Sequence, residues 1–187
     1  VYDKAIQVAQ EAAENTEVNE PNLSGNHIGP LVSEVQYNKV QDLIDAGIKE
    51  GAKLIAGGLG RPEGFNRGYF VRPTVFADVN NDMRIAREEV FGPVLSIIPF
   101  ETEEEAIAIS NDTSYGLTDY VQSGDNERTQ RVARQLRAGM VQVNGAPRAS
   151  GSPFGGYKQS GNGREGGIEG FEEFLETKAV SGWTTTS

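Results

Sequence analysis

The sequence contains no cysteine and only one histidine, His27, among its 187 residues. Without cysteine the chain has no disulfide bond, no thiolate nucleophile and no thiolate metal ligand. One histidine also argues against a histidine-based metal site or a Ser-His-Asp triad, because these sites need several partners of the right type. We therefore expect no thiolate catalysis, no Ser-His triad and no metal site built from cysteine or histidine in this chain.

The chain also lacks an excess of positive charge and any long apolar run. It carries 17 Lys and Arg against 27 Asp and Glu, a formal net charge of −10, whereas nucleic acids need a basic patch. The longest apolar stretches, such as residues 94–100, are strand-sized and too short to span a bilayer. The chain begins with Val1 rather than Met and shows no signal segment. We expect a cytoplasmic portion of a longer polypeptide that binds neither nucleic acid nor a membrane.

Hydrophobic periodicity and capping residues predict several helices. They cover residues 2–14, 34–50, 103–110, 126–137 and 168–175. Ser33 and Gln36 fit a capping box at the start of the second helix, and Thr102 and Asp125 are the expected N-caps of the third and fourth. The apolar face of the second helix comprises Val40, Leu43, Ile44 and Ile48.

Short apolar segments between turn residues predict strands. They cover residues 53–56, 69–76, 94–100, 118–122, 140–144 and 177–183. Pro73 lies inside the second segment and favours an edge or the start of a strand. From residue 94 onward, strands and helices alternate with short connections, which is typical of right-handed crossovers. The sequence therefore predicts an α/β fold with three layers, α/β/α, and a mainly parallel sheet.

Residues 161–166 read Gly-Asn-Gly-Arg-Glu-Gly and match the G-x-G-x-x-G pattern of dinucleotide-binding turns. That pattern holds a pyrophosphate where a strand precedes it and a βαβ unit follows. Residues 152–160 have the composition of a loop instead. We therefore interpret these glycines as a loop without a cofactor role.

Two charged segments allow a structural and a functional interpretation. Glu88 and Glu89 precede Phe91 at the mouth of a predicted strand, where ligands gather in α/β sheets. They form either a ligand contact or a solvated acidic turn. Residues 128–137 carry four arginines, and a solvated helix surface explains them better than a phosphate site.

Six blocks of the sequence resemble the aldehyde dehydrogenase superfamily, in order and at similar spacing, from about residue 1 to residue 180. The blocks are Gly29-Pro-Leu, Glu50-Gly-Ala-Lys-Leu, Gly68-Tyr-Phe-Val-Arg-Pro-Thr-Val, Glu88-Glu-Val-Phe-Gly-Pro-Val, Asn111-Asp-Thr-Ser-Tyr-Gly-Leu and Ser152-Pro-Phe-Gly-Gly-Tyr-Lys-Gln-Ser-Gly-Asn-Gly-Arg-Glu. The resemblance implies an enzyme that oxidises an aldehyde to a carboxylic acid with NAD or NADP, through a cysteine thioester.

The resemblance places the family's cysteine, general base and adenosine-binding domain upstream of this chain. It therefore implies a C-terminal fragment that is inactive by itself and binds no cofactor alone. Glu89 resembles the family's glutamate that binds the nicotinamide-ribose hydroxyls, and Phe91 resembles the aromatic residue near the nicotinamide ring. Lys49 falls loosely where the family has another ribose contact.

The resemblance also implies contacts to a small-molecule aldehyde. Phe154 resembles the aromatic residue of the aldehyde tunnel, and residues 145–151, beginning with Gly145, resemble the loop that shapes its mouth. Arg148 in this loop departs from the aromatic-rich versions. It either attracts an aldehyde that bears a carboxylate or points to solvent.

By the same resemblance, residues 1–176 form a partial catalytic domain and residues 177–187 a strand that leads to the oligomerisation region. Because unpaired strands pair readily with other chains, we expect a homo-oligomer, a dimer or tetramer in the full-length enzyme. Two alternatives stay open: a non-catalytic binding or assembly module, and a CoA-acylating relative. Neither the identity of the aldehyde nor the choice between NAD and NADP follows from the sequence.

Overall fold

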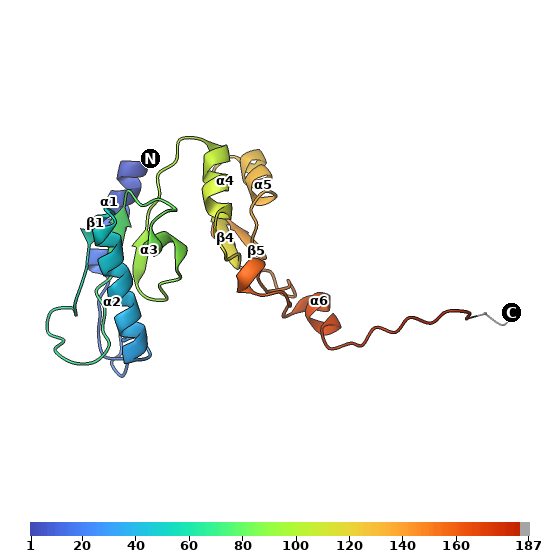
Figure 1. Cartoon of the computed structure of the whole chain (residues 1–187), viewed down its shortest axis with the longest axis horizontal. Helices are drawn as coiled ribbons and strands as arrows, with labels where there is room; N and C mark the ends of the chain where they lie inside the picture. Colours follow the sequence, from blue (N-terminus) through green and yellow to red (C-terminus); the bar gives the residue numbers. More distant parts are fainter. Residues whose placement is uncertain (184–187) are drawn as a thin grey trace. The chain divides into compact units, whose positions relative to one another are not determined.

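The computed structural model describes residues 1–183 of the chain. These residues form two compact units, divided between Glu101 and Thr102. Each unit has a small sheet and helices of its own, which are labelled in Figure 1. No helix in the described part of the chain is long and apolar enough to cross a membrane.

The first unit is built around a sheet of three strands. Its helices are α1 (Tyr2–Asn15), α2 (Glu34–Lys49) and α3 (Arg84–Arg87), and its strands are β1 (Lys53–Ala56), β2 (Thr74–Ala77) and β3 (Val94–Ser96). The strand order is β1-β2-β3. β1 runs antiparallel to β2, with Lys53 opposite Ala77, whereas β3 runs parallel to β2, with Thr74 opposite Val94.

Helix α2 begins where the sequence predicts. The Ser33 hydroxyl accepts a hydrogen bond from the Gln36 backbone N–H at 3.2 Å, which satisfies one of the free donors of the first turn. The helix ends at Lys49, one residue before the predicted end. The second half of the predicted capping box is wrong, because the Gln36 side chain donates to the carbonyls of Val90 and Phe91 instead of its own helix.

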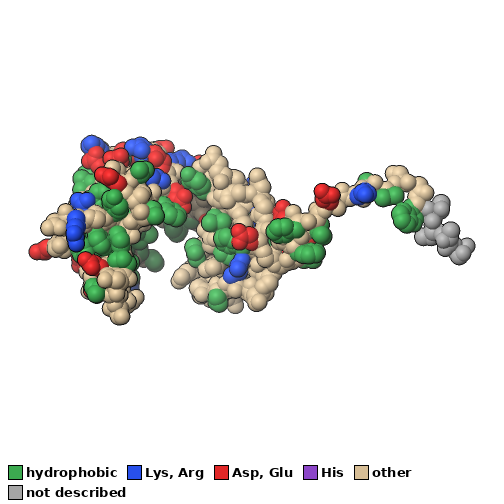
Figure 2. Space-filling view, turned by 90° about the horizontal axis from the view of Figure 1, so that it is seen from below, with side chains coloured by type: hydrophobic (Ala, Val, Ile, Leu, Met, Phe, Trp, Pro, Cys, Tyr) green, Lys and Arg blue, Asp and Glu red, His purple; other side chains and the backbone are tan. Residues whose placement is uncertain are grey.

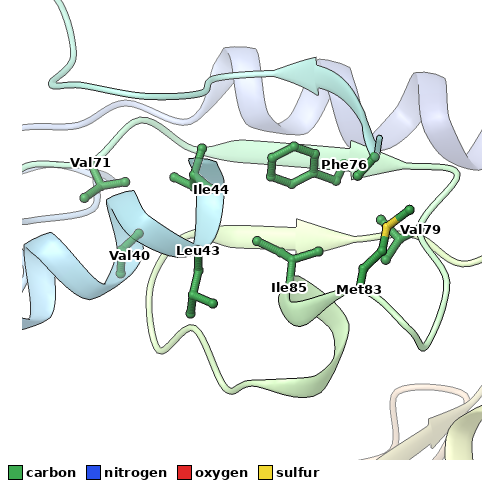
Figure 3. Packing of buried hydrophobic residues seen from close by; sticks show 9 residues of the cluster. Val40, Leu43, Ile44, Val71, Phe76, Val79, Met83 and Ile85 are labelled. Atoms are coloured by element: carbon green, nitrogen blue, oxygen red, sulfur yellow. The ribbon is translucent and has the colours of Figure 1, made fainter. Parts of the chain in front are cut away.

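One face of α2 packs into the core of the first unit (Figure 3). The buried residues of this face are Val40, Leu43 and Ile44, each at most 1% exposed. Phe76 of β2 is fully buried in the same cluster. Removing each such side chain from water contributes about 1.5–3 kcal/mol. Ile48 was predicted on this face but is 40% exposed, because Gly47 is the residue that meets Phe76 and α3.

The second unit contains the remaining elements. They are α4 (Glu103–Asn111), β4 (Thr118–Val121), α5 (Asn126–Ala133), β5 (Met140–Val143), a 3-10 turn η1 (Lys158–Ser160) and α6 (Gly167–Glu172). β4 and β5 are parallel, with Thr118 opposite Met140, and α5 connects them. This strand–helix–strand unit is the crossover that the sequence predicts.

The predicted caps of α4 and α5 are confirmed. The Thr102 hydroxyl accepts from the Glu105 N–H at 3.1 Å, and the Asp125 carboxylate accepts from two N–H groups of the first turn of α5. α5 ends at Ala133 rather than at residue 137. The backbone N–H of Arg137 donates to the Asn111 side chain at 2.7 Å, so this residue has left the helix.

The predicted α/β class with parallel strands is confirmed, and the described strands form two sheets. The second strand is shorter than residues 69–76 and begins directly after Pro73, which has no N–H for a ladder. The third strand covers Val94–Ser96 instead of residues 94–100 and is not fully buried, since Leu95 is 50% exposed. These boundaries depend on hydrogen-bonded neighbours more than on apolar composition.

The predicted last strand, residues 177–183, is not a strand in the structure, because no other part of residues 1–183 pairs with it. The last four residues of the predicted C-terminal segment, 184–187, lie outside the described residues. α6 ends at Glu172 instead of residue 175, and Phe174 beyond it is 88% exposed. The role of the segment in oligomerisation stays a prediction.

Candidate functional site

The turn of residues 88–93 connects α3 to β3 and carries two of the predicted cofactor contacts. Glu88 forms an ion pair with Arg84 (2.7 Å), and this hydrogen bond holds the pKa of Glu88 below its ordinary value. Glu89 is exposed, and within residues 1–183 its carboxylate takes part in no hydrogen bond or ion pair. The two neighbouring carboxylates therefore differ: one neutralises an arginine, and the other is available to a ligand.

The backbone of this turn is bound by α2. The Gln36 side-chain amide donates to the carbonyls of Val90 (2.8 Å) and Phe91 (3.0 Å). The Lys39 ammonium donates to the carbonyl of Glu89 at 2.6 Å. Residues three apart on a helix share a face, which is why both side chains reach the same turn. Neither residue was predicted from the sequence to contact this turn, although their spacing of three on a predicted helix indicates a shared face.

Phe91 has an unusual backbone conformation. Its φ angle is +53°, in the left-handed region that non-glycine residues rarely adopt, and its side chain is 71% exposed. The next residue, Gly92, lies so close to α2 that a Cβ there would be 2.9 Å from a methyl group of Val40. The turn thus packs on the buried Val40 through Gly92, while the Phe91 ring is exposed.

The structure does not bring Lys49 to this turn. Lys49 follows Lys39 by ten residues, about 15 Å along a helix. Its ammonium pairs with Asp45 at 2.5 Å, and this bond raises the pKa of Lys49. Both residues line a shallow hollow together with Glu50 and Arg84. Lys39, and not Lys49, contacts the backbone of Glu89, and the predicted ribose contact of Lys49 stays a prediction.

The predicted substrate loop follows β5 in the second unit. Asn144 and Gly145 have φ angles of +51° and +71°, and the Ala146 N–H donates to the Val143 carbonyl at 3.0 Å. These features define a type I′ turn, for which Asn-Gly is the favoured pair. The Asn144 side chain also exchanges two hydrogen bonds with the backbone of Ser123. Gly145 is therefore a turn residue, exposed at the end of the β4–β5 sheet.

Arg148 and Phe154 lie together in this loop. The Arg148 guanidinium carbon is 5.4 Å from the centre of the Phe154 ring, a cation–π contact. The backbone of Phe154 is held by a reciprocal pair of hydrogen bonds with Glu165, at 2.8 and 2.7 Å. Arg148 is exposed, and within the described residues no carboxylate neutralises it.

Basic side chains stabilise the rest of the loop. Arg164 donates to the carbonyls of Gly156 (3.0 Å) and Gly163 (2.8 Å), and Lys158 donates to the carbonyls of Asn111 (2.8 Å) and Thr113. These bonds use the two cations structurally, which leaves Arg148 as the cation of the loop that faces solvent. The loop thus combines backbone carbonyls bound by two cations with one exposed guanidinium.

The other segments weighed from the sequence have structural roles. Residues 161–166 follow η1 rather than a strand and lead into α6, which has six residues, so the context of a dinucleotide fingerprint is absent from this described segment. Arg131 of α5 binds both carboxylate oxygens of Glu103, at 2.7 and 2.9 Å. Among residues 1–183, no group of three or more His, Cys, Asp or Glu is arranged to hold a metal ion.

Comparison with known proteins places these regions in a family. The aldehyde dehydrogenase family profile matches residues 1–180. A 3-succinoylsemialdehyde-pyridine dehydrogenase from a Pseudomonas species is 57% identical over 181 residues, which are 97% of this chain and 38% of that protein.

Solved structures agree with the sequence matches. An aldehyde dehydrogenase from Bartonella henselae superposes with a TM-score of 0.94 at 59% identity, over 97% of this chain and 38% of that one. A variant of aldehyde dehydrogenase C from Pseudomonas syringae, in complex with NAD⁺ and octanal, has a TM-score of 0.94 at 48% identity, over 100% of this chain and 38% of that one. The chain spans about 38% of the length of these relatives, and it belongs to the aldehyde dehydrogenase family.

Proposed function

We propose that this chain forms part of an NAD(P)-dependent aldehyde dehydrogenase, which oxidises an aldehyde to a carboxylic acid. The observation that carries the proposal is the turn of residues 88–93, where an exposed carboxylate and an exposed ring stand on a backbone bound to α2. The complex of the Pseudomonas syringae relative with NAD⁺ and octanal supports both the cofactor and the substrate class.

In this proposal, Glu89 and Phe91 hold the nicotinamide end of the cofactor. One carboxylate accepts hydrogen bonds from two ribose hydroxyls at once, and the exposed face of the phenyl ring packs against the nicotinamide. When bound, the nicotinamide accepts the hydride that leaves the aldehyde. Because NAD and NADP share this end, the assignment holds for both. The contact of Lys49 to a ribose stays a separate proposal, because its ammonium pairs with Asp45.

The chain supplies no nucleophile for the thioester step, because it contains no cysteine. We propose that the cysteine, the general base and the adenosine-binding residues come from outside these 187 residues. The purified chain is therefore expected to show no aldehyde oxidation and no tight binding of NAD⁺. NAD⁺-dependent turnover by the purified chain would contradict this.

The cofactor assignment is tested in a hybrid enzyme, in which this chain replaces the matching segment of the Bartonella henselae relative. Glu89→Gln removes the charge from the proposed ribose contact, and hydrogen bonds to charged groups contribute about 1.5–3 kcal/mol. We expect the KM for NAD⁺ to rise at least about 10-fold in steady-state kinetics. The control is Glu63→Gln, the same change at an exposed position. An unchanged KM for NAD⁺ would refute the contact.

On the substrate side, we propose that Phe154, Arg148 and the turn at Gly145 line the aldehyde tunnel. Arg148 is the position that sets the substrate class, because its guanidinium is exposed and unpaired and is stacked on Phe154. An aldehyde with a remote carboxylate would pair with it in a bidentate way. In the hybrid enzyme, Arg148→Ala should raise the KM for a carboxylate-bearing aldehyde about 10-fold and change that for a neutral aldehyde of equal length far less. An equal rise in KM for both aldehydes would contradict the proposed role of Arg148.

A second candidate function is an assembly module, favoured by the apolar surface after η1. Its exposed residues include Phe171, Phe174, Val180 and Trp183, which are 58–88% exposed. We propose that residues 177–187 pair with another chain in a homo-oligomer, a dimer or tetramer. Sedimentation analysis of the chain and of a form ending at residue 176 tests this, and a monomeric full chain would contradict it. Assembly without cofactor binding in the hybrid enzyme would favour the module over the enzyme.

A further inference from the structure

We propose that Gln36 is a positioning residue, which fixes the turn of residues 88–93 so that Glu89 and Phe91 meet the nicotinamide end of the cofactor. The proposal rests on the proposed function for its effect on the cofactor. Its structural part, the control of the turn by one helix side chain, is measurable without any cofactor.

Both N–H donors of the Gln36 side-chain amide are hydrogen-bonded to the turn of residues 88–93. A glutamine side chain has two N–H donors, and here one goes to the Val90 carbonyl at 2.8 Å and the other to the Phe91 carbonyl at 3.0 Å. These bonds join residues that are 54 and 55 positions apart in the sequence. Gln36 is half-buried, so water replaces these bonds only in part.

The backbone of this turn needs support from residues outside it. Phe91 is in the left-handed region, with φ at +53°, which a residue with a side chain adopts only where its surroundings impose it. A hydrogen bond to the carbonyl of the residue itself and another to the preceding carbonyl restrain the peptide groups on both sides of this φ angle. Gln36 thus binds the peptide groups on both sides of the residue that has the unfavourable φ angle.

The neighbours of Gln36 on α2 contact the same turn. Lys39 binds the Glu89 carbonyl at 2.6 Å, so two side chains hold three consecutive carbonyls. Val40, one residue later, is fully buried and meets Gly92. The contact between Gly92 and Val40 sets the distance between the turn and α2. The side chains of Gln36 and Lys39 set the orientation of the peptide groups of the turn.

The decisive variant is Gln36→Glu. It keeps the shape of the side chain but replaces both donors with acceptors, which repel the carbonyls. It does not weaken α2, because an acidic residue in the first turn is favourable for a helix. The matched control is Val35→Glu, which adds the same charge at a neighbouring position that is 80% exposed.

Amide hydrogen exchange of the 187-residue chain is the first readout. We expect the hydrogen-bonded amides at the two ends of the turn, those of Glu88 and Val94, to exchange about 10-fold faster in Gln36→Glu, while the amides of the buried face of α2 stay protected. Val35→Glu should leave the turn unchanged. Gln36→Arg, which retains two parallel donors, should restore most of the protection.

Steady-state kinetics of the hybrid enzyme are the second readout. Gln36→Glu should raise the KM for NAD⁺ about 10-fold and leave the KM for the aldehyde unchanged. Unchanged exchange in the turn overturns the proposal, whatever the kinetics show. Faster exchange with an unchanged KM for NAD⁺ also overturns it, provided that Glu89→Gln does raise that KM. If neither variant changes the KM for NAD⁺, the proposed ribose contact fails, and the positioning role fails with it.

Discussion

The two candidate regions of this chain are held in place in different ways. The turn of residues 88–93 depends on one face of α2, where Gln36 and Lys39 bind its carbonyls and Val40 packs below Gly92. The loop of residues 144–166 is held by many bonds that begin and end within the second unit, several of them from Arg164 and Lys158. Few contacts over a long sequence separation support the first region, and many contacts support the second.

The two regions should differ in their sensitivity to single substitutions. A turn that depends on a few side chains should respond strongly to single substitutions at those positions. A loop with many modest hydrogen bonds should lose about 0.5–1.5 kcal/mol with each one. Each of the next three predictions tests this difference, starting with the largest effect.

The largest effect is expected from Gly92→Val in the turn of residues 88–93. Even the first carbon of a new side chain would lie 2.9 Å from a methyl group of Val40, so the turn must move away from α2. Overpacking of this kind costs about 1–3 kcal/mol of unfolding free energy. Urea denaturation measures this free energy. The double variant of Gly92→Val and Val40→Ala should lose less unfolding free energy than the sum of the losses in the two single variants. Full additivity would show that the two positions do not meet.

A smaller effect is expected from Arg164→Met in the loop. The variant keeps much of the aliphatic side chain but loses the bonds to the carbonyls of Gly156 and Gly163, at about 1 kcal/mol each. The matched control is Arg134→Met, since Arg134 is exposed and makes no side-chain hydrogen bond or ion pair within residues 1–183. Equal stability of the two variants in urea denaturation would mean that the Arg164 bonds do not support the loop.

The smallest effect is expected from the ion pair that joins α4 to α5. The hydrogen bond from Arg131 lowers the pKa of Glu103. A carboxyl group with a lowered pKa in the folded state stabilises the fold above its unfolded pKa, and this contribution is lost as the pH falls through the folded pKa. Arg131→Gln should therefore lower the Tm slightly at pH 7 and not at pH 3. Because the pair is exposed, salt should reduce the difference. A Tm difference that persists at pH 3 would assign the effect to packing.

Local signals in the sequence predicted the helix starts well. Ser33, Thr102 and Asp125 act as N-caps because a cap needs only its own first turn. The blocks that resemble aldehyde dehydrogenases also identified the family, and the family match over residues 1–180 confirms it. The caps depend on residues that are close together in the sequence, and the family match depends on short blocks of sequence.

The hydrogen-bond partners of side chains were predicted less well from the sequence. Gln36 was expected to bond within its own helix, whereas the folded chain offers it two carbonyls from residues 90 and 91. Lys39 was not predicted to contact the turn of residues 88–93, but its ammonium binds the Glu89 carbonyl. The local pattern does not show which segment this face of α2 meets, because only the packing of the turn on α2 decides it.

The sequence by itself determined the family, the α/β class, the helix caps and the segments that carry the candidate site. The tertiary structure decided which strands pair, why residues 177–183 have no partner within residues 1–183, and how the turn of residues 88–93 is supported. The physical reason is the range of the interactions. A cap or an Asn-Gly turn is satisfied within a few residues, whereas a strand ladder or a hydrogen bond across 54 positions exists only after the chain has folded.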